Sequence, residues 1–148
     1  SELETFLPLY VTNRRRKNRS TEKLQLPIFP NYVFARMVEP ERIRVLRLPG
    51  VVGIVGTGRE ATPIPDIEIE SLKLGMKGGI VIPHPFVKIG VRVRVTNGVM
   101  AGLEGVLIRQ HNDVRVVINV ESIGRGMAIE IDVADIEVIK SNKSLPMQ

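Results

Sequence analysis

The sequence predicts an α+β domain, in which an antiparallel sheet packs with helices, followed by a small all-β barrel. Three observations predict it: strand-like and helix-like patterns mix before residue 79, only strand-like patterns follow residue 90, and neither period is present between them. The chain has 148 residues, of which 43% are hydrophobic, and this is enough for two small cores. We therefore expect a first domain over residues 1–78, a linker over 79–88, a second domain over 89–140 and a tail over 141–148.

The first domain opens with strand-like runs around a basic segment. The run Arg14-Arg15-Arg16-Lys17-Asn18-Arg19, followed by Ser20-Thr21-Glu22-Lys23, has no apolar period, so we expect a solvated loop between two strands. Residues 26–37 then alternate, with Tyr32 and Phe34 on one face and Val33 on the other. Both faces are partly apolar, which predicts one strand with core beneath it and a second apolar contact above it.

Two helices and a short strand complete the first domain. Pro40 stands where a first-turn proline is tolerated, and apolar residues at helical spacing follow it until Pro49-Gly50, so this segment predicts a short helix. Residues 51–56 predict a compact buried strand. Asp66 predicts the cap of a second helix, which the glycines at 78 and 79 end.

The second domain is predicted from strands that follow each other at short intervals with turn residues between them. A closed barrel leaves few open strand edges, and an SH3-like barrel fits the length best. The expected strands are 91–95, 104–110, 114–120, 127–132 and 136–139.

Composition excludes several classes of protein. The chain has no cysteine, which excludes disulfide scaffolds, thiolate zinc sites and cysteine nucleophiles. No stretch approaches the ~20 apolar residues of a membrane span, so we expect a cytoplasmic protein. The net charge of +5 favours acidic or phosphate-bearing partners.

The first residues of the sequence have the pattern of a segment inside a domain rather than of its start. We therefore expect further elements before Ser1 in the full-length protein.

The residue types of an active site do not come together in the sequence. His84 and His111 lie in the expected linker and in a polar turn, without a second ligand or carboxylate at useful spacing. The glycines at 53, 56 and 58 lack the spacing of a phosphate-binding loop. We therefore expect no enzymatic activity, no metal and no cofactor.

The segment from Gly90 to Leu107 is the most informative part of the chain. An alternating strand, the Asn97-Gly98 turn and Gly102 before a second strand predict a β-hairpin with Val91, Val93, Val95 and Val106 in the core and two arginines outside. The amino-acid sequence of this segment also resembles the KOW motif, including the glycine at 102. The resemblance implies that the barrel is an SH3-like KOW domain.

Upstream segments extend the resemblance to nearly the whole chain. Residues 29–34 (FPNYVF), 48–56 (LPGVVGIVG) and 63–66 (PIPD) follow each other in the order of landmarks in the NusG N-terminal domain. The first domain is therefore identified as NusG-type, although the first strand and helix of that domain do not precede Ser1. Pro30-Asn31-Tyr32 and residues 6–9 are more similar to specialised paralogues of the UpxY and RfaH type, which act as antiterminators on chosen operons.

The resemblance implies a transcription elongation or antitermination factor that acts as a monomer. Its first domain would bind the clamp helices of RNA polymerase, and the polymerase-binding positions would be Phe29, Pro30, Tyr32, Phe34, Ile69 and Leu72. Nucleic-acid contacts, to non-template DNA or nascent RNA, would come from Arg14, Arg15, Arg16, Lys17, Arg42, Arg44 and Arg47. The KOW domain would bind Rho or a ribosomal small-subunit protein through Met100, Leu103, Ile123 and Arg125.

Each assignment has a structural alternative. The apolar positions can be ordinary core, the basic run can be a solvated loop, and the KOW positions can be rim packing. A ribosomal or other RNA-binding KOW protein is the alternative function, because the positive charge and the barrel suit it equally. Residues 114–120 are rich in β-branched side chains, so we expect the barrel to remain a barrel.

Overall fold

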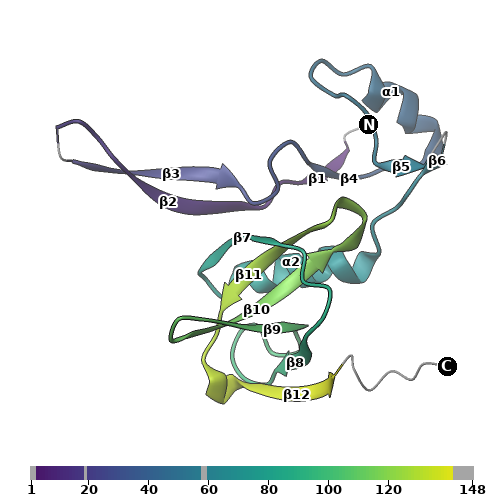
Figure 1. Cartoon of the computed structure of the whole chain (residues 1–148). Coiled ribbons are helices and arrows are strands. Elements are labelled where there is room, and N and C mark those ends of the chain that lie inside the picture. The colour runs from purple at the N-terminus through teal and green to yellow at the C-terminus, as the bar shows by residue number, and fades with distance from the viewer. Residues whose placement is uncertain (1–2, 19, 58–59, 142–148) are drawn as a thin grey trace.

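The computed structural model describes residues 3–18, 20–57 and 60–141 (Figure 1). Its N-terminal part contains short antiparallel strand pairs rather than one continuous sheet. The pairs are β1 (Glu4–Phe6) with β4 (Phe34–Arg36), β2 (Leu9–Arg15) with β3 (Thr21–Pro27), and β5 (Gly56–Thr57) with β6 (Glu60–Ala61).

The β2–β3 hairpin extends away from the rest of the molecule (Figure 1). The expected loop over residues 14–23 is wrong in part, because Arg14 and Arg15 continue β2 and residues 21–23 already belong to β3. The outer half of a projecting ribbon is solvated on both faces, so it forms without an apolar period. The basic segment is therefore held on a regular strand pair, and only its end forms a turn.

The single strand expected over residues 26–37 is interrupted. β3 ends at Pro27 and β4 begins at Phe34, with a turn between them that the Tyr32 amide closes on the Phe29 carbonyl at 3.0 Å. Asn31 has a φ of 73°, in the left-handed region that ends a strand and that few residues other than glycine and asparagine adopt. Val33, expected in the core, is exposed.

Helices lie where the sequence predicts them. η1 (Glu39–Glu41) and α1 (Arg42–Leu46) follow Val38, with Pro40 in the first turn, and α2 spans Asp66–Lys77. The expected cap is wrong by one residue: Pro65 is the N-cap of α2, and Asp66 lies in the first turn, where its charge favours the helix dipole.

The buried strand expected over residues 51–56 is also wrong. Residues 51–54 form no regular structure, and Val52 is 103% exposed. An apolar run becomes a buried strand only when neighbouring strands and a covering layer are present, and the described residues supply neither at this place.

The C-terminal part is a curled antiparallel sheet of six strands in the order β12-β8-β9-β10-β11-β7. This confirms the predicted fold class, a NusG-type α+β part followed by an all-β SH3-like KOW domain. The strands are β7 (Val81–Pro85), β8 (Val91–Val95), β9 (Glu104–Gln110), β10 (Asp113–Val120), β11 (Arg125–Glu130) and β12 (Ile136–Ser141), with 3₁₀ turns η2 (Glu121–Ile123) and η3 (Val133–Asp135).

The segment expected as a linker, residues 79–88, contains β7, which pairs with β11. The Glu130 amide donates to the Ile80 carbonyl at 3.2 Å, so the even-numbered residues of this segment turn their backbone groups toward β11. Pro83 and Pro85 therefore have their nitrogens on the outer edge, where a missing N–H costs no ladder hydrogen bond. The prolines made the segment look like a linker, yet they are compatible with an edge strand.

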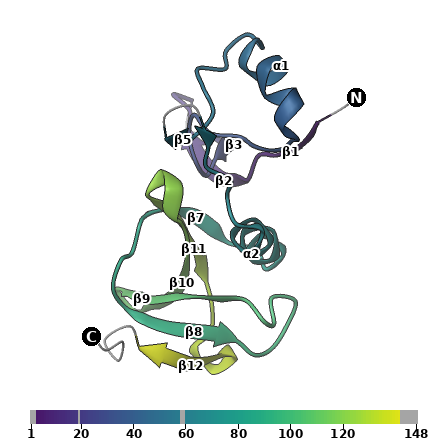
Figure 2. The same ribbon diagram turned by 90° about the vertical axis from the view of Figure 1, so that its right-hand side faces the viewer.

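One cluster of buried residues joins the two parts of the chain. It runs from Ile28 and Phe29 through Leu72 of α2 to the inner side chains of the sheet, such as Val93 and Val116. α2 lies against β10 and β11 (Figure 2), and Gly75 allows this close approach because a Cβ there would meet Ile129. Phe29 and Leu72 of the inferred polymerase-binding set therefore share one core with Met100 and Leu103 of the KOW set.

Candidate functional site

The positive charge of the chain is concentrated in the β2–β3 hairpin. Residues 9–27 hold six basic residues and one acidic residue, a formal charge of +5, which equals the net charge of the whole chain. Residues 89–140, which we call the β-domain, hold six basic and seven acidic residues, a formal charge of −1. Arg14, Arg15, Arg16 and Lys17 are all exposed. A polyanion would therefore meet the strongest attraction at the hairpin rather than at the β-domain.

Hydrogen bonds join the described residues on the two sides of the hairpin tip. The Arg16 amide donates to the Ser20 carbonyl at 2.9 Å, and the Asn18 side chain accepts from the amide and hydroxyl of Ser20 at 3.2 and 2.7 Å. Arg16 also forms an ion pair with Glu22 on β3. These contacts hold the basic side chains at the end of a defined ribbon.

The aromatic residues near Pro30 divide into a buried and a half-buried group. Phe29 is 1% exposed, and Phe34 lies between it and Phe6, with ring centroids 5.8 and 5.9 Å apart. Tyr32 is only half-buried and packs at the margin of the core, beside the exposed Pro30. The expected exposure of Phe29 is wrong, because its ring supports this surface from below.

The two candidate positions on α2 also differ. Leu72 is 0% exposed and belongs to the core cluster, so its expected place on a docking surface is wrong in this structure. Ile69 is half-buried. The cause is the packing of α2 on the sheet, which buries the helix face that carries Leu72.

A cation–π contact links the two parts of the chain. The guanidinium carbon of Arg125, at the start of β11, lies 6.0 Å from the centroid of the Tyr32 ring. Arg125 and Ile123 remain exposed and half-buried, respectively, as a partner-binding rim requires. Met100 and Leu103 are not accessible to a partner, because both are buried in the core cluster. Their expected accessibility is therefore wrong.

The arginines of α1 have a mixed environment. Arg42 is half-buried and forms an ion pair with Glu39 at 3.4 Å. Arg44 lines a shallow hollow with Leu48, and both Arg44 and Arg47 are exposed. Arg44 and Arg47 therefore remain suitable for contacts with phosphate, whereas Arg42 already has a carboxylate partner.

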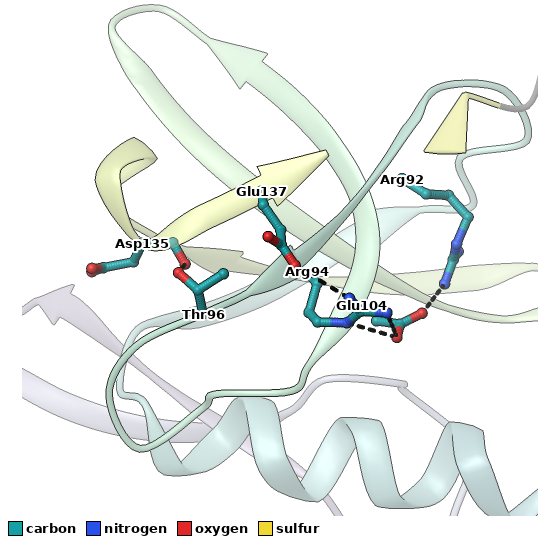
Figure 3. Close-up of polar contacts among 6 residues, drawn as sticks. All are labelled: Arg92, Arg94, Thr96, Glu104, Asp135 and Glu137. Carbon is teal, nitrogen blue, oxygen red and sulfur yellow. Dashed lines mark hydrogen bonds and ion pairs between the residues drawn. The ribbon is translucent and has the colours of Figure 1, made fainter. Parts of the chain in front are cut away.

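Two arginines of β8, Arg92 and Arg94, are paired with carboxylates (Figure 3). Arg94 bonds to Glu104 at 3.0 Å and to Glu137 at 3.2 Å, and Arg92 lies 3.9 Å from Glu104. The hydrogen bond to Glu104 is the main cause that raises the pKa of Arg94. This ladder of two arginines and two glutamates has no net charge, so it offers little attraction to RNA.

Glu68 on α2 occupies an unfavourable place beside η2. Its Oε1 atom is buried and has no hydrogen-bond partner among the described residues. Burial raises the pKa of Glu68, the backbone hydrogen bond from Glu121 opposes this shift, and the Glu121 carboxylate raises the pKa further. The contact between α2 and η2 is therefore sensitive to the charge of this carboxyl group.

We expect Glu68→Gln to stabilise the folded chain near pH 7. Folding raises the pKa of Glu68 above its ordinary value of 4.5, so the protonated form adds stability that is complete below that value and is lost as the pH rises through the raised pKa. Glutamine imitates the protonated form at every pH. Denaturant unfolding should show a gain at about pH 7 that vanishes at about pH 4. Glu70→Gln, at an exposed position of the same helix, is the control; an equal gain there would contradict this prediction.

Comparisons with known proteins agree with the geometry. Residues 1–73 match the family described as "Transcription termination factor nusG". The chain is 30% identical over 136 residues to the transcription termination/antitermination protein NusG of Lactococcus lactis subsp. lactis, a match that covers 88% of this chain and 72% of that protein. The chain belongs to the NusG family. The NusG protein of Streptococcus pyogenes serotype M3 is 29% identical over 123 residues, covering 79% of this chain and 68% of that protein.

The described residues contain no helix that could cross a membrane, and no cluster of three or more potential metal ligands. The best-formed hollows of the described ranges are open and shallow; one lies beside α1, and one is lined by the acidic side chains of Asp113, Glu130 and Asp132. His84 makes a local contact to the Pro85 carbonyl at 2.7 Å.

Sequence reasoning missed three contributors to the surfaces of this NusG-family chain. Lys23 lies opposite Asn13 in the hairpin, and the register of the two strands would have revealed it. The contact of Arg125 with Tyr32 and that of Glu68 with Glu121 join residues far apart in the chain. No local pattern could have signalled these two contacts.

Proposed function

We propose that this chain is a non-enzymatic, cytoplasmic transcription elongation and antitermination factor that binds RNA polymerase through its N-terminal part. Membership of the NusG family supports this, and so does the half-buried Tyr32 ring next to the exposed Pro30. An aromatic ring at the margin of a core is a typical anchor of a protein interface. The place of Tyr32 at the margin of the core, in a chain of the NusG family, is the observation that carries the proposal.

The binding surface would consist of Pro30, Tyr32 and Ile69, with Phe29, Phe34 and Leu72 as its supporting layer. It would dock on the clamp helices of the largest polymerase subunit, as the family resemblance implies. Binding that favours the closed clamp would shift the polymerase away from paused states, since a ligand shifts an equilibrium only by its differential affinity for the two states. No covalent chemistry is needed for this action.

The β-domain would recruit a second protein, either Rho or a ribosomal small-subunit protein. Ile123 and Arg125 are the accessible members of the expected set, while Met100 and Leu103 would shape the rim from within. We also propose two domains, at residues 1–78 and 89–140; β7, in the segment between them, pairs with β11 of the second. The functional unit would be a monomer.

We further propose a specialised role of the UpxY or RfaH type, on selected operons. The Pro30-Asn31-Tyr32 sequence supports it, where general members of the family have glycine in the middle. The φ of 73° at Asn31 gives a physical reason why this position accepts glycine or asparagine and few other residues. Mapping the full-length protein on transcribed genes would test this role: occupancy of a few loci supports it, and occupancy of all genes contradicts it.

The alternative function, an RNA-binding KOW protein, is disfavoured by the distribution of charge. Its β-domain would need an open basic surface, yet residues 89–140 have a formal charge of −1 and Arg94 is engaged by two glutamates. The basic residues lie on the hairpin of the NusG-type part instead.

Binding to purified partners separates the two functions. We expect the chain, extended by any residues that precede Ser1 in its gene, to be retained by immobilised core RNA polymerase and not by ribosomal subunits. Retention by ribosomal subunits alone would contradict the proposed function and favour the alternative.

A further inference from the structure

The two faces of the β2–β3 hairpin differ in chemistry. Cross-strand partners place their side chains on the same face, so the register assigns every residue of the hairpin to one face or the other. We call one the polar face; it carries Val11, Asn13, Arg15, Thr21, Lys23 and Gln25. We call the other the apolar face; it carries Tyr10, Thr12, Arg14, Glu22, Leu24 and Leu26.

These six residues of the polar face are exposed, whereas Leu9 and Pro27, which share this face at the base of the hairpin, are half-buried. They provide two cations from Arg15 and Lys23, two amides from Asn13 and Gln25, and no carboxylate. The apolar face is partly buried near its base and holds the only acidic residue of the hairpin, Glu22, which pairs with Arg16. The polar face is thus the side on which a polyanion would meet both charge and hydrogen-bonding groups.

We propose that the polar face of the hairpin binds double-stranded DNA in the major groove. A two-stranded ribbon fits a major groove about 12 Å wide, and arginine, lysine, asparagine and glutamine are the side chains that bond to base edges there. Arg16 and Lys17 at the tip lie where they would reach the phosphates at the groove rim. This inference deepens the nucleic-acid contact of the proposed function by naming its partner and the face that binds it.

The hairpin lacks what a single strand or an RNA duplex would require. Single-stranded nucleic acids bind aromatic platforms on which bases stack, and residues 11–26 contain no aromatic side chain. Tyr10 stands at the base of the ribbon on the opposite, apolar face. The major groove of A-form RNA is too deep and narrow for a ribbon to enter. B-form DNA is therefore the nucleic acid that fits this face.

The pairing of the two strands favours binding as well. The Arg16 amide donates to the Ser20 carbonyl at 2.9 Å, and the Asn18 side chain accepts from the Ser20 amide. A ribbon that is already folded loses less conformational entropy when it binds than a flexible loop does.

Titration of the isolated protein with labelled nucleic acids tests the proposal. We expect a DNA duplex to bind more tightly than either its single strands or an RNA duplex of the same sequence. Arg15→Gln with Lys23→Gln should raise the Kd for the duplex about tenfold and reduce the slope of log K against log salt by about two. Lys88→Gln with Arg109→Gln removes the same charge from exposed positions of the β-domain and should leave both values unchanged.

A second pair of variants examines base contacts. Asn13→Ala with Gln25→Ala should keep the salt dependence and weaken the preference among duplexes of different sequence, since amides read bases and carry no charge. Equal binding of single strands, or an equal loss in the control variant, would overturn the proposal. Polymerase is absent from these titrations, so the two proposals can fail separately. Normal duplex binding without retention by polymerase would refute the proposed function alone. Retention by polymerase without duplex binding would refute this inference alone.

Discussion

Gly105→Ala is expected to destabilise the folded chain by about 3 kcal/mol, the largest stability effect among the changes considered. A Cβ at position 105 would lie 2.6 Å from the Val117 carbonyl oxygen and 2.7 Å from Cγ1 of Val116. The backbone oxygen belongs to the β9–β10 ladder and can move only if the two strands separate. For a chain of this size the loss corresponds to a fall in Tm of about 6–12 °C.

Gly53→Ala is the matched control for this change. A Cβ at position 53 would meet no atom within 4 Å, and Gly53 does not have a positive φ. Thermal unfolding of the two variants should therefore separate the cost of crowding from the general effect of replacing a glycine. A Gly105→Ala protein as stable as the Gly53→Ala protein would show that β9 and β10 do not approach as closely as described.

Tyr32→Ala is expected to weaken binding to core RNA polymerase about 30-fold, as loss of an aromatic anchor worth about 2 kcal/mol would. Tyr32 packs at the margin of the core and contacts Arg125, so its removal should alter stability much less than binding. Tyr32→Phe keeps the ring and should retain most of the affinity. Equilibrium binding to immobilised polymerase, with circular dichroism as a check on folding, measures both effects.

Two further variants make this experiment specific. Val138→Ala removes an exposed apolar side chain from β12, far from the candidate surface, and should bind polymerase normally. Phe34→Ala is unsuitable as a binding probe, because the Phe34 ring contacts both Phe6 and Phe29 and its loss would disturb the fold. Unchanged affinity of a folded Tyr32→Ala protein would contradict the proposed docking surface.

The β-domain could be predicted from the sequence because its signals are local. Alternation in residues 91–95 places Val93 and Val95 inside and Arg94 outside, and the structure confirms all three positions. The turn glycines at 98 and 102 have positive φ values of 86° and 96°, as their places between the strands predict. Each of these features depends on neighbours in the chain, which a reader of the sequence can see.

The N-terminal part was harder to predict because its outcome depends on distant residues. Residues 51–56 have the composition of a buried strand, but Val52 is exposed since nothing among the described residues covers it. Residues 79–88 look like a linker, yet the open edge of β11 recruits them as β7. The sequence pattern gives a face for each residue, and only the fold decides what covers that face.

The same limit applies to the candidate sites. Alternation groups Tyr32 with Phe34 and helix spacing groups Ile69 with Leu72, but neither pattern tells which residues are accessible. Phe29, Leu72, Met100 and Leu103 are buried because α2 and the N-terminal turn pack against the curled sheet. The exposure of the basic residues 14–17 could be predicted without knowledge of the packing, because a run of charged side chains stays in contact with solvent.

The central claim is that the surface around Tyr32 docks on the clamp helices of RNA polymerase. A photo-crosslinking amino acid placed at position 32, with position 138 as the reference, tests it most directly on assembled elongation complexes. The account predicts adducts from position 32 to the clamp helices of the largest subunit and none from position 138. Adducts from position 32 to other proteins, or the same weak pattern from both positions, would contradict it.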